Sequence, residues 1–297
     1  MIRITEQEID NLEGYRAFIN ELLKAIGRRD EATIRGVIEM LHEARMRIAT
    51  NLMTAEGWDF YHLKNLQAIV ERSLRRFQDE LSQTLITAEE IAYQQGGLAV
   101  EEPLAQMGYR VSFADLSPYQ LMVIQAYSAD LIKGLVDDAL NRINNTLALG
   151  ILGEKSPFQI MKEITEILGE EKIKAIGGIA YRAEKIARTE LSRISNMATF
   201  ARQQDAAKHI PGLMKEWVSV LLPGRTRPHH WAAHGQRVLV NEPFIVMGEK
   251  MMLPLDPAGS PANVINCMCR SVLYHPSWEI SIRGEQLPTG EFAILRR

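Results

Sequence analysis

Apolar residues recur every three or four positions over most of the 297-residue chain, and this periodicity constrains the fold more than any other feature. One such series begins at Ile9 and continues through Leu12, Tyr15, Ile19 and Leu23. A period near 3.6 is typical of amphipathic α-helices. We therefore expect helices that start near residue 5 and that cover about residues 31–53, 58–95, 117–149, 156–168 and 179–208.

Serine followed by proline marks the start of two of these helices. The motifs are SPYQ at residues 117–120 and SPFQ at residues 156–159. In each motif the serine caps the first turn, the proline supplies its preset φ, and the glutamine reaches back to a free amide. Thr5–Glu8 has the form of a capping box for the first helix, and Gly96-Gly97 and Gly177-Gly178 predict helix ends.

The pattern changes after residue 208. Prolines become frequent, and short alternating runs replace the helical period, as in KEWVSVLL at residues 215–222 and RSVLY at residues 270–274. Such runs are typical of strands. The fold class predicted is mainly α, with a long-helix domain over residues 1–207 and a small α+β module over residues 208–297. The last long helix, residues 179–207, should pack on this module.

Composition excludes several classes of protein. The chain has 46% hydrophobic and 24% charged residues, as globular proteins do, and no apolar run reaches the roughly 18 residues of a membrane span. Residues 1–10 lack the apolar core of a signal peptide, so we expect no export and no membrane partner. The net charge is −3, but residues 206–297 carry 10 basic and 7 acidic groups. This excess predicts at most weak, non-specific contact with DNA.

The only two cysteines, Cys267 and Cys269, lie one residue apart and follow a histidine-rich stretch at residues 225–235. Zinc accepts a mixed nitrogen and sulfur ligand set. The candidate ligands are Cys267, Cys269 and one of His229, His230 and His234. The spacing differs from the usual zinc knuckle and no fourth ligand is evident, so two buried thiols without metal are the competing interpretation. A metal-dependent nuclease built from the same residues, with Asp256 and Asn266, is a further alternative.

A carboxylate interrupts the apolar face of the last long helix. Glu190 follows Ala183 and Ile186 on that face. A buried Glu190 needs a cation, whereas a Glu190 at the edge of the face would form an exposed pair with Arg193. The sequence leaves both interpretations open.

The order of these motifs resembles the phage Mu F-like head-morphogenesis domain, over about residues 180–275. The motifs are ARTE at 187–190, KEW at 215–217, RTRPHH at 225–230, LPLDP at 253–257 and NCMC at 266–269. Matched position by position, the signature falls on Arg188, Thr189, Glu190, Trp217, Arg225, Thr226, Arg227, His230, Gly235, Pro254, Asp256, Asn266, Cys267 and Cys269. Two positions depart from the family: Pro223-Gly224 replaces an acidic residue, and Met268 replaces the arginine of NCRC.

The resemblance implies a low-copy structural protein of a phage or prophage head, and not an enzyme. Such a protein would lie in the capsid interior or at the portal vertex, after assembly in the host cytoplasm. It would bind the portal and other head proteins, serve head assembly, DNA packaging or ejection, and need no cofactor. Besides the nuclease, the other alternative to this structural role is an internal virion protein that binds DNA non-specifically. We also expect NCMC and RTRPHH to form one interior cluster closed over Glu190, with Arg225 or Arg227 neutralising that carboxylate.

Overall fold

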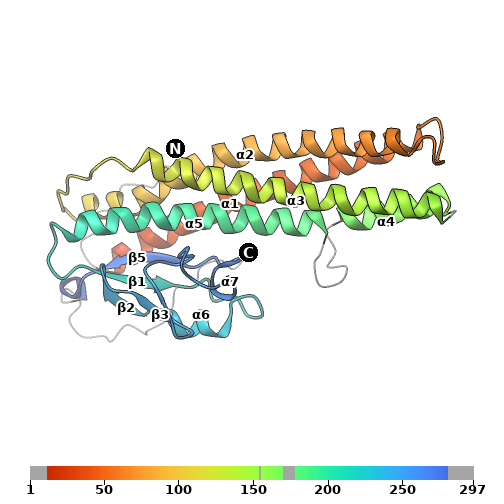
Figure 1. The fold of residues 1–297 in the computed structure, drawn as a ribbon. Coiled ribbons are helices and arrows are strands. Elements are labelled where there is room, and N and C mark those ends of the chain that lie inside the picture. Colours follow the sequence, from red (N-terminus) through yellow and green to blue (C-terminus); the bar gives the residue numbers. More distant parts are fainter. Residues whose placement is uncertain (1–11, 154, 170–177, 280–297) are drawn as a thin grey trace. The chain divides into compact units, whose positions relative to one another are not determined.

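The computed structural model describes residues 12–153, 155–169 and 178–279. Five long or medium helices supply most of the structure, which confirms the predicted fold class (Figure 1). They are α1 (Leu12–Met53), α2 (Leu63–Gln106), α3 (Pro118–Leu152), α4 (Pro157–Leu168) and α5 (Ile179–Ala207). None of the helices in the described ranges combines the length and the apolar character that a membrane crossing requires.

Local capping chemistry sets the start of α4 as predicted. The Ser156 side chain accepts from the Gln159 amide, and the Gln159 side chain accepts from the Ser156 amide. The Ser117 hydroxyl likewise accepts from the Gln120 amide at 3.3 Å, at the start of α3. The predicted capping box at Thr5–Glu8 lies outside the described residues.

Two predicted helix boundaries are wrong. The first two predicted helices form the single helix α1, because Leu23, Ile26, Asp30 and Ile34 continue one buried face across the expected break. The predicted end at Gly96-Gly97 lies inside α2, which continues to Gln106. A Cβ on Gly96 would lie 2.2 Å from the carbonyl oxygen of Ser195, so this glycine permits close contact with α5.

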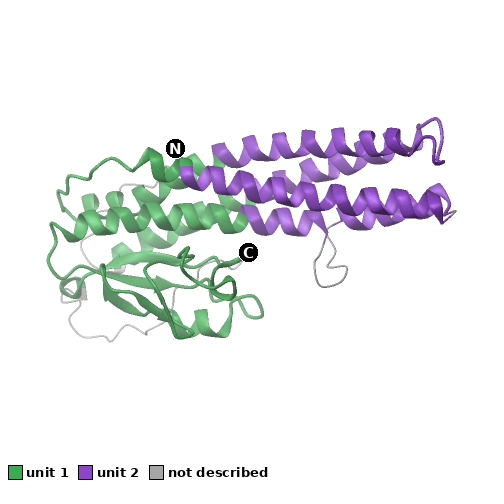
Figure 2. Ribbon diagram, viewed as in Figure 1, with its two compact units in different colours: residues 1–31, 88–122, 188–297 green, residues 32–87, 123–187 purple. Residues whose placement is uncertain are grey.

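The chain forms two compact units (Figure 2). Unit 2 comprises residues 32–87 and 123–187, and its described secondary-structure elements are all helices. Its core is built from leucine, isoleucine and phenylalanine side chains such as Leu74, Phe77, Ile132 and Ile164. An ion pair between Arg182 and Asp138 joins α5 to α3 within this unit.

Unit 1 comprises residues 1–31, 88–122 and 188–297, and it contains all the strands of the described chain. The strands are β1 (Met214–Val218), β2 (Arg237–Leu239), β3 (Phe244–Val246), β4 (Glu249–Met251) and β5 (Arg270–Tyr274). An antiparallel sheet has the order β2-β1-β5, and β3 and β4 form a separate hairpin. The short helices are α6 (Pro228–Ala233), α7 (Pro261–Val264) and the 3-10 helix η1 (Pro276–Glu279).

Two apolar clusters hold unit 1 together. One joins helical residues such as Ile19, Leu22 and Val100 to Val218 and Leu273 of the sheet. The other lies inside the strand-containing module and includes Trp217, Phe244, Met251, Leu255, Val264, Cys267 and Cys269. The change from helix to strand falls between Ala207 and Met214. The division of the chain into domains at residue 207 stays a prediction.

Candidate functional site

Both cysteines point into the same interior cluster because of the backbone around them. Asn266 has φ of 58°, a left-handed conformation that asparagine tolerates better than most residues. The chain then runs without helix from Cys267 to Cys269 before β5 begins. In an extended segment residues two apart share a face, so the two sulfur atoms face inward together while Met268 faces elsewhere. Both thiols are free and buried.

His230 faces these two sulfurs from α6. Its Nδ1 lies 3.5 Å from Cys267 Sγ and 3.3 Å from Cys269 Sγ. The three donor atoms lie within 4.8 Å of one another, and all three residues are buried. The Cys269 amide donates to Cys267 Sγ at 3.4 Å. The arrangement offers one imidazole and two thiols on a common centre.

Side chains behind His230 fix the orientation of its ring. Asn263 is fully buried, and its Oδ1 lies 3.3 Å from His230 Nε2 while its Nδ2 donates to Val246 O at 3.4 Å. An amide oxygen only accepts, so Nε2 carries a proton toward Asn263 and Nδ1 is the nitrogen that faces the sulfurs. The Ser219 hydroxyl donates to His230 O at 2.6 Å and thereby anchors the helix backbone as well.

The other two candidate histidines have different surroundings. His234 Nδ1 accepts from the Ser219 amide at 3.0 Å, which ties α6 to the end of β1. Burial lowers the pKa of His234 below its ordinary value, although Glu216 opposes this effect. Burial, His230 and Arg227 also lower the pKa of His229. Of the three histidines, the described structure brings His230 to the cysteines.

The two thiols differ in acidity. Burial raises the pKa of Cys267, but hydrogen bonds with Cys269 and His230 outweigh it and hold the pKa well below the ordinary value. Burial raises the pKa of Cys269, and the nearby Cys267 sulfur raises it further. Because two adjacent thiolates repel each other, the pair favours a single negative charge.

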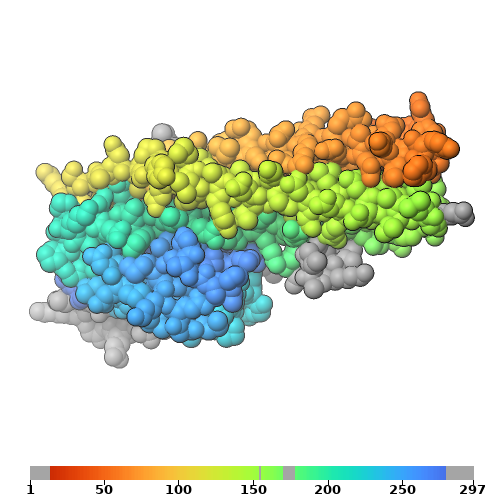
Figure 3. Space-filling model, viewed as in Figure 1, coloured from red at the N-terminus to blue at the C-terminus, as the bar shows by residue number. Residues whose placement is uncertain are grey.

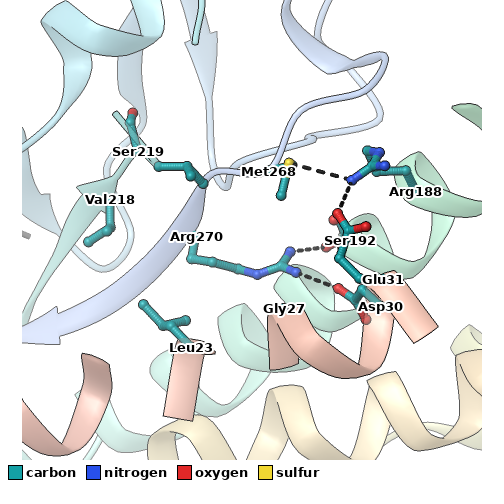
Figure 4. A pocket seen from close by; sticks show the side chains of 11 residues that line it. Leu23, Gly27, Asp30, Glu31, Arg188, Ser192, Val218, Ser219, Met268 and Arg270 are labelled. Carbon is teal, nitrogen blue, oxygen red and sulfur yellow. Dashed lines mark hydrogen bonds and ion pairs between the residues drawn. The ribbon is translucent and has the colours of Figure 1, made fainter. Parts of the chain in front are cut away.

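Helix α5 supports the cysteine segment through its signature residues. Thr189 Oγ1 accepts from the Asn266 amide at 2.9 Å. Arg188 Nη1 donates to Glu31 Oε1 at 2.8 Å and lies 3.8 Å from Met268 Sδ (Figure 4). Met268, the residue that departs from the arginine of NCRC, thus contacts Arg188 of α5.

Glu190 is buried, as the first of the two interpretations required. Its partner is Arg193, which the second interpretation named. Arg193 Nη1 donates to both Glu190 oxygens, at 2.8 and 2.6 Å. Burial raises the pKa of Glu190 above its ordinary value, although Arg193 lowers it. The expected neutralisation by Arg225 or Arg227 is wrong, because Arg193, one helical turn away, already occupies the carboxylate.

The RTR turn lies beside the cysteine segment. Arg227 donates from Nη2 to Ile265 O, and Thr226 Oγ1 accepts from the Leu222 amide at 3.0 Å. A cavity of about 30 Å³ separates this turn from the cluster. Its lining includes Arg225, Thr226, Arg227, His230, Asn266, Cys267 and Cys269.

The remaining signature residues organise backbone and core. Trp217 is buried edge-on against His230 and Phe244, with ring centroids 5.8 and 5.3 Å apart. Gly235 has φ of 79° and donates its amide to Trp217 O at 2.8 Å. Asp256 accepts from the Met252 and Ala258 amides at 2.7 and 2.9 Å, so its carboxylate shapes a turn.

Three polar residues on α5 that sequence reasoning missed also bind β5. Asn196 Nδ2 donates to Cys269 O at 3.0 Å, and its Oδ1 accepts from the Ser271 amide at 3.3 Å. Gln203 exchanges hydrogen bonds with the Ser271 hydroxyl at 3.1 Å. Ser192 O accepts from Arg270 Nη1 at 3.2 Å. A signal exists in the sequence, because Thr189, Asn196 and Gln203 recur at intervals of seven on one helix face.

A second cavity, of about 40 Å³, lies between α1, α5 and the β5 segment within unit 1 (Figure 4). Arg270 crosses it and donates from Nη2 to Asp30 Oδ2 at 3.0 Å. Burial lowers the pKa of Arg270, and Asp30 opposes that shift. These charges pair within the protein. We therefore interpret the Arg270–Asp30 pair beside this cavity as a structural link between β5 and α1.

Searches of curated proteins and of solved structures found no match. A family model described as "Phage Mu protein F like protein" matches residues 141–272. This range includes the α5 signature, the RTR turn and the Cys–His cluster. Residues 141–272 are therefore a phage Mu F-like domain.

Proposed function

We propose that this chain is a minor head protein of a tailed phage or prophage, bound to the portal and acting in head assembly, DNA packaging or ejection. It would occupy the capsid interior or the portal vertex, after assembly in the host cytoplasm. The match of residues 141–272 to the Mu F-like family carries this proposal. It supports a head protein in general, and the portal is the specific partner that we propose.

The contacts that the signature residues make agree with a structural role. Glu190 is held by Arg193, Asp256 by two backbone amides, and Thr189 by the Asn266 amide. A general acid or base needs access to a reacting group. These side chains are instead committed to neighbours that hold α5, the turns and the cysteine segment in place.

An exposed apolar end of unit 2 is the surface that we assign to a head-protein partner. The connections α1–α2 and α3–α4 lie at the same end of this unit (Figures 2 and 3). Large apolar side chains there are 67–92% exposed: Met53, Phe60, Tyr61, Leu149, Leu152 and Phe158. Large exposed apolar side chains gathered at one end of a unit indicate a candidate interaction site.

Co-expression with the portal protein of the same phage tests this assignment. We expect the full chain to co-purify with the portal, and Phe60→Ser/Phe158→Ser to lose co-purification while its circular dichroism is unchanged. Met46→Ser is the matched control, because Met46 is an exposed apolar residue of unit 2 on the long helix α1. If the wild-type chain does not bind the portal and is missing from purified particles, the proposal is wrong.

A metal-dependent nuclease is the second candidate, favoured by Arg225 and Arg227 beside the cluster. Guanidinium groups bind phosphate well. Nicking of plasmid DNA that requires a divalent metal and is lost in His230→Ala would support this activity. Salt-sensitive retention on DNA without nicking would instead support a DNA-binding internal protein.

A further inference from the structure

We propose that His230 Nδ1, Cys267 Sγ and Cys269 Sγ bind one zinc ion, which fastens α6 to the segment that leads into β5. This inference concerns the construction of the Mu F-like domain and does not depend on the assembly role proposed above.

The distances between the donor atoms fit a tetrahedral ion. Zinc–sulfur bonds of about 2.3 Å and zinc–nitrogen bonds of about 2.0 Å, at the tetrahedral angle, place N and S about 3.5 Å apart. The observed separations from His230 Nδ1 are 3.5 Å to Cys267 Sγ and 3.3 Å to Cys269 Sγ. The two nitrogen–sulfur separations therefore match two edges of such a tetrahedron, and all three donor atoms lie within 4.8 Å of one another.

The imidazole ring is already held in an orientation that suits a metal, with Nδ1 toward the two sulfurs. Asn263 accepts the Nε2 proton of His230, and its own amide group is oriented by Val246 O. Metal-bound histidines usually donate their second nitrogen to a fixed acceptor, which sets the tautomer and the ring orientation.

The CxC spacing agrees with an ion bound from an extended strand. Zinc knuckles place their cysteines on a tight turn, which requires two to four intervening residues. Here one intervening residue suffices, because residues two apart share a face of an extended chain. The left-handed turn at Asn266, pinned by Thr189, aims that face at His230.

The fourth coordination position faces the cavity beside the RTR turn. This cavity of about 30 Å³ has room for a water molecule, since about 10–15 Å³ is enough for one. We assign the fourth position to water or a small anion. Zn²⁺ with two thiolates and a neutral imidazole carries no net charge, so its burial costs less than that of an isolated ion. Arg225 and Arg227 would favour an anion as the fourth ligand.

Elemental analysis of the full, tag-free chain tests the proposal. Protein expressed with added zinc and then desalted should contain about one zinc ion per chain. Cys267→Ser/Cys269→Ser should lose it, while His209→Gln should keep it, because His209 is exposed and is no part of the cluster. A wild-type chain without zinc would overturn the proposal, as would zinc that survives in the double serine variant.

A second measurement covers the case in which the double variant fails to fold. Cobalt bound to the wild-type chain should give the intense visible bands of tetrahedral coordination and a thiolate charge-transfer band. His230→Asn should weaken both bands, and chelation should expose both thiols to a thiol reagent. Octahedral cobalt spectra, or thiols that react equally with and without metal, would show that the cysteines do not ligate. A Cys267–Cys269 disulfide in the purified chain would overturn the proposal too.

Discussion

Arg193 and Glu190 form a buried ion pair one helical turn apart on α5. A single guanidinium nitrogen reaches both carboxylate oxygens, at 2.8 and 2.6 Å. The Glu190 side chain is 2% exposed and the Arg193 side chain 12%. Because water does not solvate either charge well, each group depends on the other.

Removal of one partner should therefore be costly. Arg193→Leu should lower the free energy of unfolding by about 3–5 kcal/mol, because it leaves a buried carboxylate without its cation. Urea denaturation at neutral pH measures this change. Glu190→Leu/Arg193→Leu should recover most of the loss, because an apolar pair leaves no buried charge. If Arg193→Leu unfolds like the wild type, Glu190 is solvated and the pair contributes nothing.

The sequence could place Glu190 on an apolar face but could not decide its environment. A helical wheel shows the neighbours of a residue on its own helix, so the pairing with Arg193 was predictable as one of two alternatives. Whether that face is covered depends on segments far away in the chain, which no local pattern describes. The expected partners Arg225 and Arg227 were wrong for the same reason.

Gly96 allows α2 and α5 to touch. A Cβ at this position would lie 2.2 Å from Ser195 O and 3.0 Å from the Ala198 Cβ, and Thr199 Oγ1 already donates to Gly96 O at 2.8 Å. Gly96→Ala should therefore push the helices apart and lower the free energy of unfolding by about 1–3 kcal/mol. Thermal denaturation followed by circular dichroism measures the effect.

Gly36→Ala provides the control on α1. Apart from its chain neighbours and the adjacent backbone of its own helix, no atom lies within 4 Å of the Cβ that alanine would add there. Alanine forms helix better than glycine, so this variant should gain about 0.5–1 kcal/mol. If both glycine variants gain stability, the close approach at Gly96 is wrong.

These two glycines explain why some helix ends were predictable and others were not. The cap at Ser156 depends on atoms within four residues, so the sequence motif predicted it correctly. Gly96-Gly97 has the same local signature as a helix end, but packing against α5 selects glycine there for its small size. Local propensity yields to tertiary contact where the two disagree.

Thr189 should support the turn that presents the cysteines. Its Oγ1 accepts from the Asn266 amide, and Asn266 is the residue with the left-handed backbone. Thr189→Val keeps the shape but removes the acceptor, which should cost about 1–3 kcal/mol and speed hydrogen exchange of this amide. Exchange of the peptide spanning residues 264–269, followed by mass spectrometry, reports the change.

Thr189→Ser is the matched variant, because serine keeps the accepting oxygen. It should protect the 264–269 peptide nearly as well as the wild type does. Equal exchange in the valine and wild-type chains would mean that the cysteine segment is ordered without help from α5.

The cysteine cluster, too, could be predicted from the sequence only in part. The order of motifs predicted that RTRPHH and NCMC meet, and the structure places them in contact through His230, which faces both cysteines. It could not choose among His229, His230 and His234, because adjacent helical residues face different directions and the choice depends on where α6 packs. Asn263, which orients His230, carries no motif of its own.

Lys215 should make the stability of the protein rise with pH. The side chain is fully buried, donates from Nζ to Met252 O at 2.6 Å and lies over the Phe200 ring, 4.5 Å from its centroid. Burial lowers the pKa of Lys215 from 10.5 to about 8, although Asp256 and Glu242 oppose the shift. Between these two values the unfolded chain binds more protons than the folded one, so unfolding becomes less favourable as pH increases.

Urea denaturation at several pH values measures this effect as a difference between two chains. The free energy of unfolding of the wild type, relative to Lys215→Met, should rise by up to about 3 kcal/mol from pH 8 to pH 10.5. Titration of tyrosines and thiols is shared by both chains and cancels in the difference. Lys208→Met is the control, because Lys208 pairs with Asp205 at the surface and should give a far smaller change. A difference for Lys215→Met that stays constant over this range would mean that the amine is hydrated in the folded protein.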